Sequence, residues 1–191
     1  MYKKIAVDNA RTIFNAATPI IKIYGVGGKR WKRNIANNPR DPRIGPWLQG
    51  QYETINETAW KNKDACLYMV QASDSIIKYV GISRNGLRHR WRTSPAYDAE
   101  TMQKLPKNQI FHSQCWKHIE SESLARPGIS FEVRAIAADA LVRTLEQIGA
   151  PISGLAVLKD DGESVVAGVE RWLCNNSSHE LAAWNVAMTG K

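Results

Sequence analysis

Two tyrosines stand eleven positions apart, each in a short run of strand-forming residues, and an arginine-rich segment follows them. Tyr68 lies in the run 66–70 and Tyr79 lies in the run 76–83, with a polar turn between the two runs. This pattern predicts a β-hairpin whose phenols lie in register on neighbouring strands. Residues 87–92 then place three arginines beside the hairpin. Guanidinium groups bind phosphate oxygens and a phenol can exchange a proton, so this combination suits chemistry on a phosphodiester.

A second basic segment precedes the hairpin. Residues 25–34 contain three glycines, four cations and one tryptophan. Such a segment can hold phosphates and stack on a base, which favours a loop that contacts a nucleic-acid backbone over a plain solvated loop. It is not a phosphate-binding nucleotide loop, because the glycine spacing and the Lys-Ser/Thr ending are missing. The four cations are Lys29, Arg30, Lys32 and Arg33.

The charge of the chain is uneven. Residues 1–62 carry 11 Lys and Arg against 4 Asp and Glu, residues 63–112 carry 8 against 4, and residues 113–191 carry 7 against 10. The net charge of +8 therefore comes from the N-terminal part and the hairpin. A basic part beside an acidic part predicts a polyanionic partner on one face, and the alternative is a solvated basic protein that binds nothing.

Length and composition restrict the class of protein. A chain of 191 residues with 43% hydrophobic content can bury one substantial core and carry an appendage. No run approaches the roughly 18 apolar residues of a membrane span, and the N-terminus lacks the apolar stretch of a signal peptide. We therefore expect a soluble, cytoplasmic protein with no membrane partner. The three cysteines are widely spaced and form no Cys-x-x-Cys pair, so the sequence supports neither a disulfide framework nor a zinc site.

The elements that would position the tyrosines and arginines form an α+β pattern. The hairpin at 66–83 and a strand at 129–136 predict a small, three-stranded, mostly antiparallel sheet flanked by helices. The helices are expected near residues 84–93, 108–121, 138–149 and 163–176. Residues 1–62 read as a basic extension of helical and irregular structure, with a helix over 6–24 interrupted at Pro19, irregular structure over 35–62 and a short helix near Glu53–Lys61. This divides the chain into a basic extension at 1–62 and a main domain at 63–191.

The hairpin resembles the signature of GIY-YIG nucleases, in which two tripeptides lie on neighbouring strands about ten residues apart. The segment 66–68 (Cys-Leu-Tyr) stands where Gly-Ile-Tyr is expected, and 79–81 (Tyr-Val-Gly) stands for Tyr-Ile-Gly. After the second tripeptide the family shows Ser or Thr, a leucine and a catalytic arginine, which correspond to Ser83, Leu87 and Arg90 if one residue is inserted near 85–86. Without that insertion, the arginine is Arg88.

The resemblance also implies the remaining site residues. A glutamate on a later helix holds a single Mg²⁺ or Mn²⁺ ion, and an asparagine after a tryptophan follows it. Glu170 and Asn185 stand in these positions, and Glu146 is the competing acid. Tyr68 or Tyr79 would accept a proton from the attacking water, Arg90 would bind a phosphate oxygen, and Asn185 and Gly81 would have structural roles near the site. Arg84, Arg88 and Arg92 are expected to contact the DNA backbone.

One residue of the family pattern departs in this chain. Ser94 stands where many members carry a histidine, and His112 resembles a later placement, where it would act as a general base or hold the attacking water. The alternative is a structural histidine.

These observations predict a metal-dependent endonuclease that acts on double-stranded DNA. A restriction or other genome-defence enzyme is the first expectation, with a phage-type or mobile-element enzyme close behind. A nuclease toxin and a non-catalytic DNA-binding module on the same scaffold are the alternatives. A double-strand cut with one site per chain would be served by a homodimer.

Overall fold

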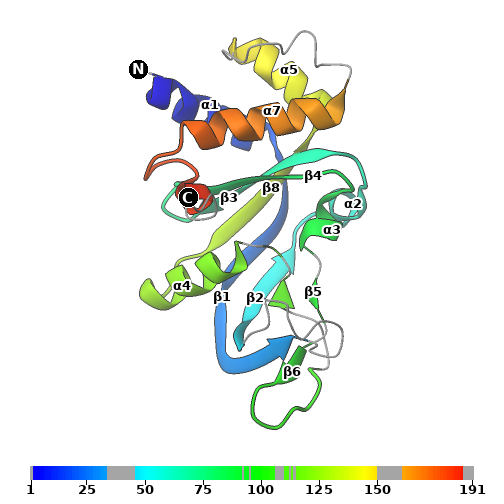
Figure 1. Cartoon of the computed structure of the whole chain (residues 1–191), viewed down its shortest axis with the longest axis vertical. Helices are drawn as coiled ribbons and strands as arrows, with labels where there is room; N and C mark the ends of the chain where they lie inside the picture. The colour runs from blue at the N-terminus through cyan, green and yellow to red at the C-terminus, as the bar shows by residue number, and fades with distance from the viewer. Residues whose placement is uncertain are drawn as a thin grey trace.

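A computed structural model describes residues 2–33, 46–91, 93–94, 96–105, 110–111, 113, 115–149 and 161–186 of the chain. Its centre is a six-stranded antiparallel sheet with helices on both faces. In Figure 1, α1, α5 and α7 lie together on one face, and α3 and α4 lie on the other. The sheet continues downward in this view as β1, β2 and β6, away from the layer of α1, α5 and α7.

The strands of this sheet follow the order β2-β1-β8-β3-β4, with β6 paired to the far end of β1. A separate two-stranded sheet joins β5 and β7. The strands are β1 (Thr18–Arg33), β2 (Trp47–Thr54), β3 (Cys66–Ala72), β4 (Ile77–Ser83), β5 (Thr93–Ser94), β6 (Ala96–Asp98), β7 (Ile110–Phe111) and β8 (Phe131–Ala137). The helices are α1 (Tyr2–Ala16), α2 (Glu57–Lys61), α3 (Leu87–Trp91), α4 (Trp116–Ala125), α5 (Ala138–Ile148), α7 (Gly162–Asn175) and α8 (Ala183–Val186).

Strand β3 is buried on both faces, and its alternate side chains enter two different cores. Leu67 and Met69 pack with apolar residues of α1, α5 and α7. Tyr68 and Val70 point to the opposite face, where α3 and α4 supply Trp91 and other aromatic side chains. This alternation places Tyr68 on the face away from α7.

The expectation of a small three-stranded sheet is wrong. The expectation that the N-terminal part is only helical and irregular is also wrong, because it contributes β1 and β2. The predicted hairpin and third strand form β4, β3 and β8, but β1 pairs with β8 and extends the sheet by β2 and β6. The helix expected over 6–24 ends at Ala16. Ile20, Ile21 and Ile23 are β-branched and stiff at χ1, and they pack at 0–1% exposure in a strand rather than along one helix face.

Two other N-terminal expectations also fail, whereas the short helix expected near Glu53–Lys61 forms as α2 (Glu57–Lys61). Residues 25–34 were expected to form a flexible loop, but residues 25–33 form the end of β1. The pairing of β1 with β2 shifts register between Ile23 and Gly25 and between Val26 and Arg30. Part of 35–62, expected to be irregular, forms β2. Residues 1–62 and 63–191, which differ in charge, therefore contribute strands to one sheet and side chains to one core.

None of the helices in the described ranges is both long and apolar enough to cross a membrane.

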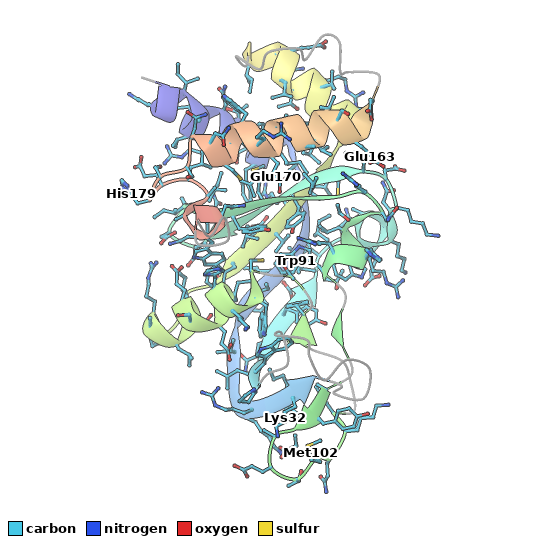
Figure 2. All side chains as sticks on the ribbon, viewed as in Figure 1. Lys32, Trp91, Met102, Glu163, Glu170 and His179 are labelled. Carbon is cyan, nitrogen blue, oxygen red and sulfur yellow. The ribbon has the colours of Figure 1, made fainter. Side chains whose placement is uncertain are left out.

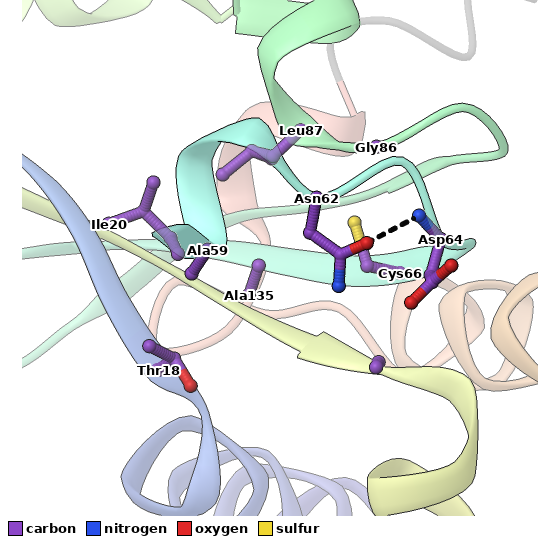
Figure 3. A pocket seen from close by; sticks show the side chains of 10 residues that line it. Thr18, Ile20, Ala59, Asn62, Asp64, Cys66, Gly86, Leu87 and Ala135 are labelled. Carbon is purple, nitrogen blue, oxygen red and sulfur yellow. Dashed lines mark hydrogen bonds between the residues drawn. The ribbon is translucent and has the colours of Figure 1, made fainter. Parts of the chain in front are cut away.

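Gly86 sets the start of α3. Its φ is +76°, and its backbone approaches the carbonyl of Asn62 so closely that a Cβ would fall 1.9 Å from that oxygen. The hydroxyl of Ser83 donates a hydrogen bond to the Gly86 carbonyl at 2.6 Å. Figure 3 shows Gly86, Leu87 and Asn62 around a small cavity of about 90 Å³ beside β3. The turn therefore fixes the direction in which α3 leaves the hairpin.

Replacing Gly86 with alanine should lower the free energy of unfolding by about 2–4 kcal/mol, because the new Cβ strains a left-handed backbone and displaces Asn62. Urea denaturation measures the change. The matched control is Gly28→Ala, where a Cβ would meet nothing within 4 Å and the change should stay within about 0.5 kcal/mol. Equal losses in the two variants would contradict the role given to Gly86.

Candidate active site

The two hairpin tyrosines meet on one face of the sheet. Tyr68 in β3 is 0% exposed and Tyr79 in β4 is 3% exposed. Tyr68 pairs with Gly81, two positions after Tyr79, so both phenols lie on the same side of the hairpin. Their ring centroids are 5.9 Å apart at an interplanar angle of 27°. Arg90 in α3 donates a hydrogen bond from Nε to the Tyr68 hydroxyl at 3.3 Å.

Gly81 makes room for this arrangement. A Cβ at Gly81 would lie 2.6 Å from Cζ and Oη of Tyr68 and 2.7 Å from Cε1 of Tyr79. Any side chain here would separate the two phenols or push them off the strand. The glycine of the second tripeptide is therefore a steric requirement of the tyrosine pair.

Glu170 lies on α7, which runs along the edge strand β4. Glu163 in the first turn of α7 pairs with Arg84 after β4 at 3.3 Å, and the chain beyond the helix returns to Ile77 at the other end of the strand. Glu170 stands about two helical turns after Glu163 on α7, whose apolar side chains pack on the face of the sheet opposite to the phenols. Figure 2 shows Glu163 near one end of the helix and Glu170 farther along it.

The charge of Arg90 reaches this carboxylate. Burial raises the pKa of Glu170, and the positive charge of Arg90 lowers it in part. Glu170 is half-buried, whereas Glu146, the competing acid, is exposed near the end of α5. The electrostatics of Glu170 are thus linked to the phenol-bound arginine.

Asn185 completes the edge of the sheet. Its Oδ1 accepts a hydrogen bond from the amide of Val80 at 3.0 Å, and its Nδ2 donates to the Val80 carbonyl at 2.7 Å. Val80 stands between Tyr79 and Gly81, so the asparagine side chain acts as a strand partner at the point where the phenols meet. Next to it, Trp184 stacks on His118 at 5.5 Å.

Burial keeps both phenols protonated. It raises the pKa of Tyr68 well above 10.0 and also raises that of Tyr79. The neighbouring thiol of Cys115 raises the pKa of Tyr79 further, while hydrogen bonding from Tyr68 and the charge of Arg90 lower it. In return, the phenols raise the pKa of Arg90. Because Arg90 donates to Tyr68 and Tyr68 can donate to Tyr79, the hydrogen-bond chain ends at the Tyr79 oxygen.

A cluster of aromatic side chains packs behind these phenols, and the sequence analysis did not predict it. We call Trp91, Phe111 and Trp116 the aromatic wall. Trp91 meets Tyr68 edge-on at 5.9 Å, and Phe111 lies between Trp91 and Trp116 at 5.5 Å from each. Cys115 is fully buried, and burial raises the pKa of its thiol to about 12. The spacing of Leu87 and Trp91, four apart on a helix, was the available signal for this wall.

The described basic residues that were expected to contact DNA fall into two groups. Arg84 and Arg88 are exposed near the hairpin, and Arg84 pairs with Glu163. The others belong to the far end of β1, where Figure 2 places Lys32 well away from Glu170. There Lys29 pairs with Asp98 at 2.9 Å, and the backbone of Arg33 belongs to the strand. This far group comprises Lys29, Arg30, Lys32 and Arg33.

Two predicted site residues, His112 and Arg92, lie outside the described residues. Of the two candidate arginines, the one bonded to Tyr68 is Arg90, and Arg88 is exposed on the same helix. No group of three or more potential metal-binding side chains is found within the described ranges. Comparisons of the chain with protein families, with curated proteins and with solved structures give no match.

Gly81→Ala should lower the free energy of unfolding by about 1–3 kcal/mol, since its Cβ would overlap both phenols. Guanidinium denaturation measures the loss, and tyrosine absorbance should show the rings disturbed. Gly168→Ala on α7 is the control. A Cβ there meets nothing within 4 Å, and the better helix former should add about 0.5–1 kcal/mol. A neutral or stabilising effect of Gly81→Ala would show that the phenols do not meet over this position.

Proposed function

We propose that the chain is a metal-dependent endonuclease that hydrolyses phosphodiester bonds in double-stranded DNA, of the GIY-YIG kind. The observation that carries the proposal is the contact of Arg90 with the Tyr68 hydroxyl, beside a second phenol and over a glycine without room for a side chain. The two tripeptides lie on paired strands, the arginine lies on the next helix, and the charge of this arginine acts on Glu170 of α7. A surface built for DNA is supported by the net charge of +8.

Arg90 would bind a non-bridging oxygen of the scissile phosphate. Its Nε donates to Tyr68 and its guanidinium also hydrogen-bonds Tyr79, while the residue keeps an exposed surface at which a phosphate could bind. Tyr68 thus orients the guanidinium. Fixed positive charge of this kind stabilises the negative charge that grows on phosphate oxygens in the transition state.

Tyr79 is the better candidate for the general base. Burial raises the pKa of Tyr79, and the hydrogen bond from Tyr68 and the charge of Arg90 offset part of that rise. Tyr68 is fully buried, and its oxygen already accepts from Arg90. A phenolate at Tyr79 would take the proton of the attacking water and pass it on to solvent.

The residues present fit one hard cation. Glu170 is a half-buried carboxylate whose pKa burial raises, so its negative charge is incompletely compensated by Arg90. A single carboxylate is enough for Mg²⁺ or Mn²⁺, which keep several waters and take phosphate oxygens as ligands. When bound, such an ion supplies charge neutralisation to the phosphate and its leaving oxygen.

A non-catalytic DNA-binding module is the second candidate. The observation that favours it is the burial of both phenols, which keeps them neutral near pH 7. For the enzyme, we propose a role in genome defence first and a phage or mobile-element role second, with a homodimer for double-strand cuts.

Glu170→Gln should reduce magnesium-dependent cleavage by about a thousandfold or more, because it removes the charge that would hold the cation. The control is Glu163→Gln on the same helix, an exposed acid whose loss should change cleavage less than about twofold. Plasmid and phage DNA, incubated with and without divalent metal, provide the assay. Full activity of Glu170→Gln would end the site assignment, and a wild-type chain that binds DNA without cutting it would favour the binding module.

The cleavage rate should rise about tenfold per pH unit between roughly pH 6.5 and 8.5, because the base acts as a phenolate whose pKa lies above this range. Below its pKa the ionised fraction falls with each step down in pH, so the slope is positive. Tyr79→Phe should lose both the slope and most of the rate. Tyr24→Phe is the control, since the pKa of Tyr24 is also raised but its side chain hydrogen-bonds Glu53 outside the site. A flat profile in the wild type would argue against a phenolate base.

A further inference from the structure

The far end of β1 carries a second feature that the proposed chemistry does not use. We call it the distal lobe and define it as residues 28–32 together with 96–105. Strand β6 pairs with β1 here, joining Trp31 to Asp98, and the chain then makes a tight loop before Leu105 returns to the core. Figure 2 shows Met102 at the outer tip of this loop, close to Lys32.

Met102 is held in an unfavourable state on two counts. Its φ is +56°, in the left-handed region where a side chain meets a steric cost that glycine would avoid. It is also 42% exposed, one of the large apolar side chains that stay in water. Ser75 and Ala182 are the other described non-glycine residues with positive φ, and both are small. Strain that the fold maintains at an exposed apolar residue points to a function at that residue.

The loop that carries Met102 is built around Asp98. The carboxylate accepts hydrogen bonds from the amides of Glu100 and Thr101 at 2.9 and 2.8 Å, and it pairs with Lys29. The Met102 amide donates to the Asp98 carbonyl at 3.1 Å. These contacts fix the backbone at Met102 before any partner arrives, which lowers the ordering cost of binding to that of the side chain alone.

The surroundings of Met102 are mainly basic, with the exposed carboxylate of Glu100 on the same loop. Arg30 and Lys104 are exposed on the same lobe, and Lys32 is half-exposed. A hollow of about 460 Å³ opens between Lys29, Arg30 and the Asp98 loop. Cations around a fixed apolar tip match a DNA duplex, which presents phosphates on either side of a groove and apolar base faces within it.

The lobe lies at a useful distance from the phenols. Thr18 in β1 pairs with Ala135, which pairs with Tyr68. Thr18 therefore lies at the same level along the sheet as the phenol site. From Thr18 to Trp31 the strand spans at most about 43 Å, and bends in β1 shorten this. One turn of B-DNA is about 34–36 Å, so a duplex held at Arg90 would reach the lobe after roughly one turn.

We propose that Met102 is a wedge that enters the minor groove of bound DNA about one helical turn from the cut, partly unstacks a base step and bends the duplex onto the basic distal lobe. Methionine is one of the apolar side chains suited to such insertion. The proposal rests on the proposed function in one respect, since it requires that the chain bind double-stranded DNA. It adds a second contact region with its own mechanical effect on the substrate.

The test uses the full chain in EDTA and a duplex of about four helical turns, selected for binding from a randomised pool so that no cleavage is needed. Energy transfer between labelled ends reports bending, and 2-aminopurine scanned through the duplex reports unstacking. The wild type should bend the duplex and brighten 2-aminopurine at one confined step. Met102→Ala and Met102→Gly should lose both signals and bind about five- to tenfold more weakly.

Three controls separate this role from folding. Met102→Leu keeps an apolar tip and should retain both signals. Met102→Gly relieves the backbone strain, so its melting temperature should equal or exceed that of the wild type while bending is lost. Leu124→Ala removes another exposed apolar side chain, 57% exposed on α4, and should change nothing.

The outcomes are distinguishable. If the wild type binds DNA but neither bends it nor unstacks a step, or if Met102→Ala keeps both effects, the wedge is refuted and the proposed nuclease stands. If the wild type binds no duplex DNA from the pool, both proposals fall together. If Met102→Ala changes only the self-association of the protein in sedimentation, Met102 contacts a second copy of the chain and the wedge is refuted.

Discussion

The candidate site depends on one steric constraint, the close approach of two phenols over a residue without a side chain. Gly81 allows Tyr68 and Tyr79 to meet, and the meeting places an oxygen where Arg90 can donate to it. The strand that carries Gly81 is an edge strand, which would ordinarily be free to shift. Asn185 holds it by bonding both polar groups of Val80. Residues 105 positions apart in sequence therefore cooperate to set one small geometry.

The hairpin was predictable because its signals are local. Apolar and aromatic residues flank a polar turn, and the register that follows places Tyr68 opposite Gly81. The choice between Arg88 and Arg90 was not local in the same way. It depends on the left-handed turn at Gly86, which sets the phase of α3. A glycine in the sequence allows such a turn but does not state its angle.

The N-terminal strands were not predictable from pattern. Strand β1 contains Pro19, three glycines and a cluster of cations, all features that favour loops when read alone. It forms because β8 and β2 supply partners on both sides, and its isoleucines then fill the core. The contact of Cys115 and the aromatic wall with the phenols is likewise tertiary. In each case the deciding interaction joins segments that are far apart in sequence, so local sequence patterns do not reveal it.

The aromatic wall has a consequence for how the site reports its own state. Trp91 lies 5.9 Å from Tyr68, and Phe111 and Trp116 continue the contact outward. Ionisation shifts phenol absorption to longer wavelength, where it overlaps the short-wavelength side of indole emission, so a charge formed on Tyr68 would quench Trp91 at this short distance. Trp91 would thus report proton loss at Tyr68 as a change in its share of the ultraviolet emission of the seven tryptophans.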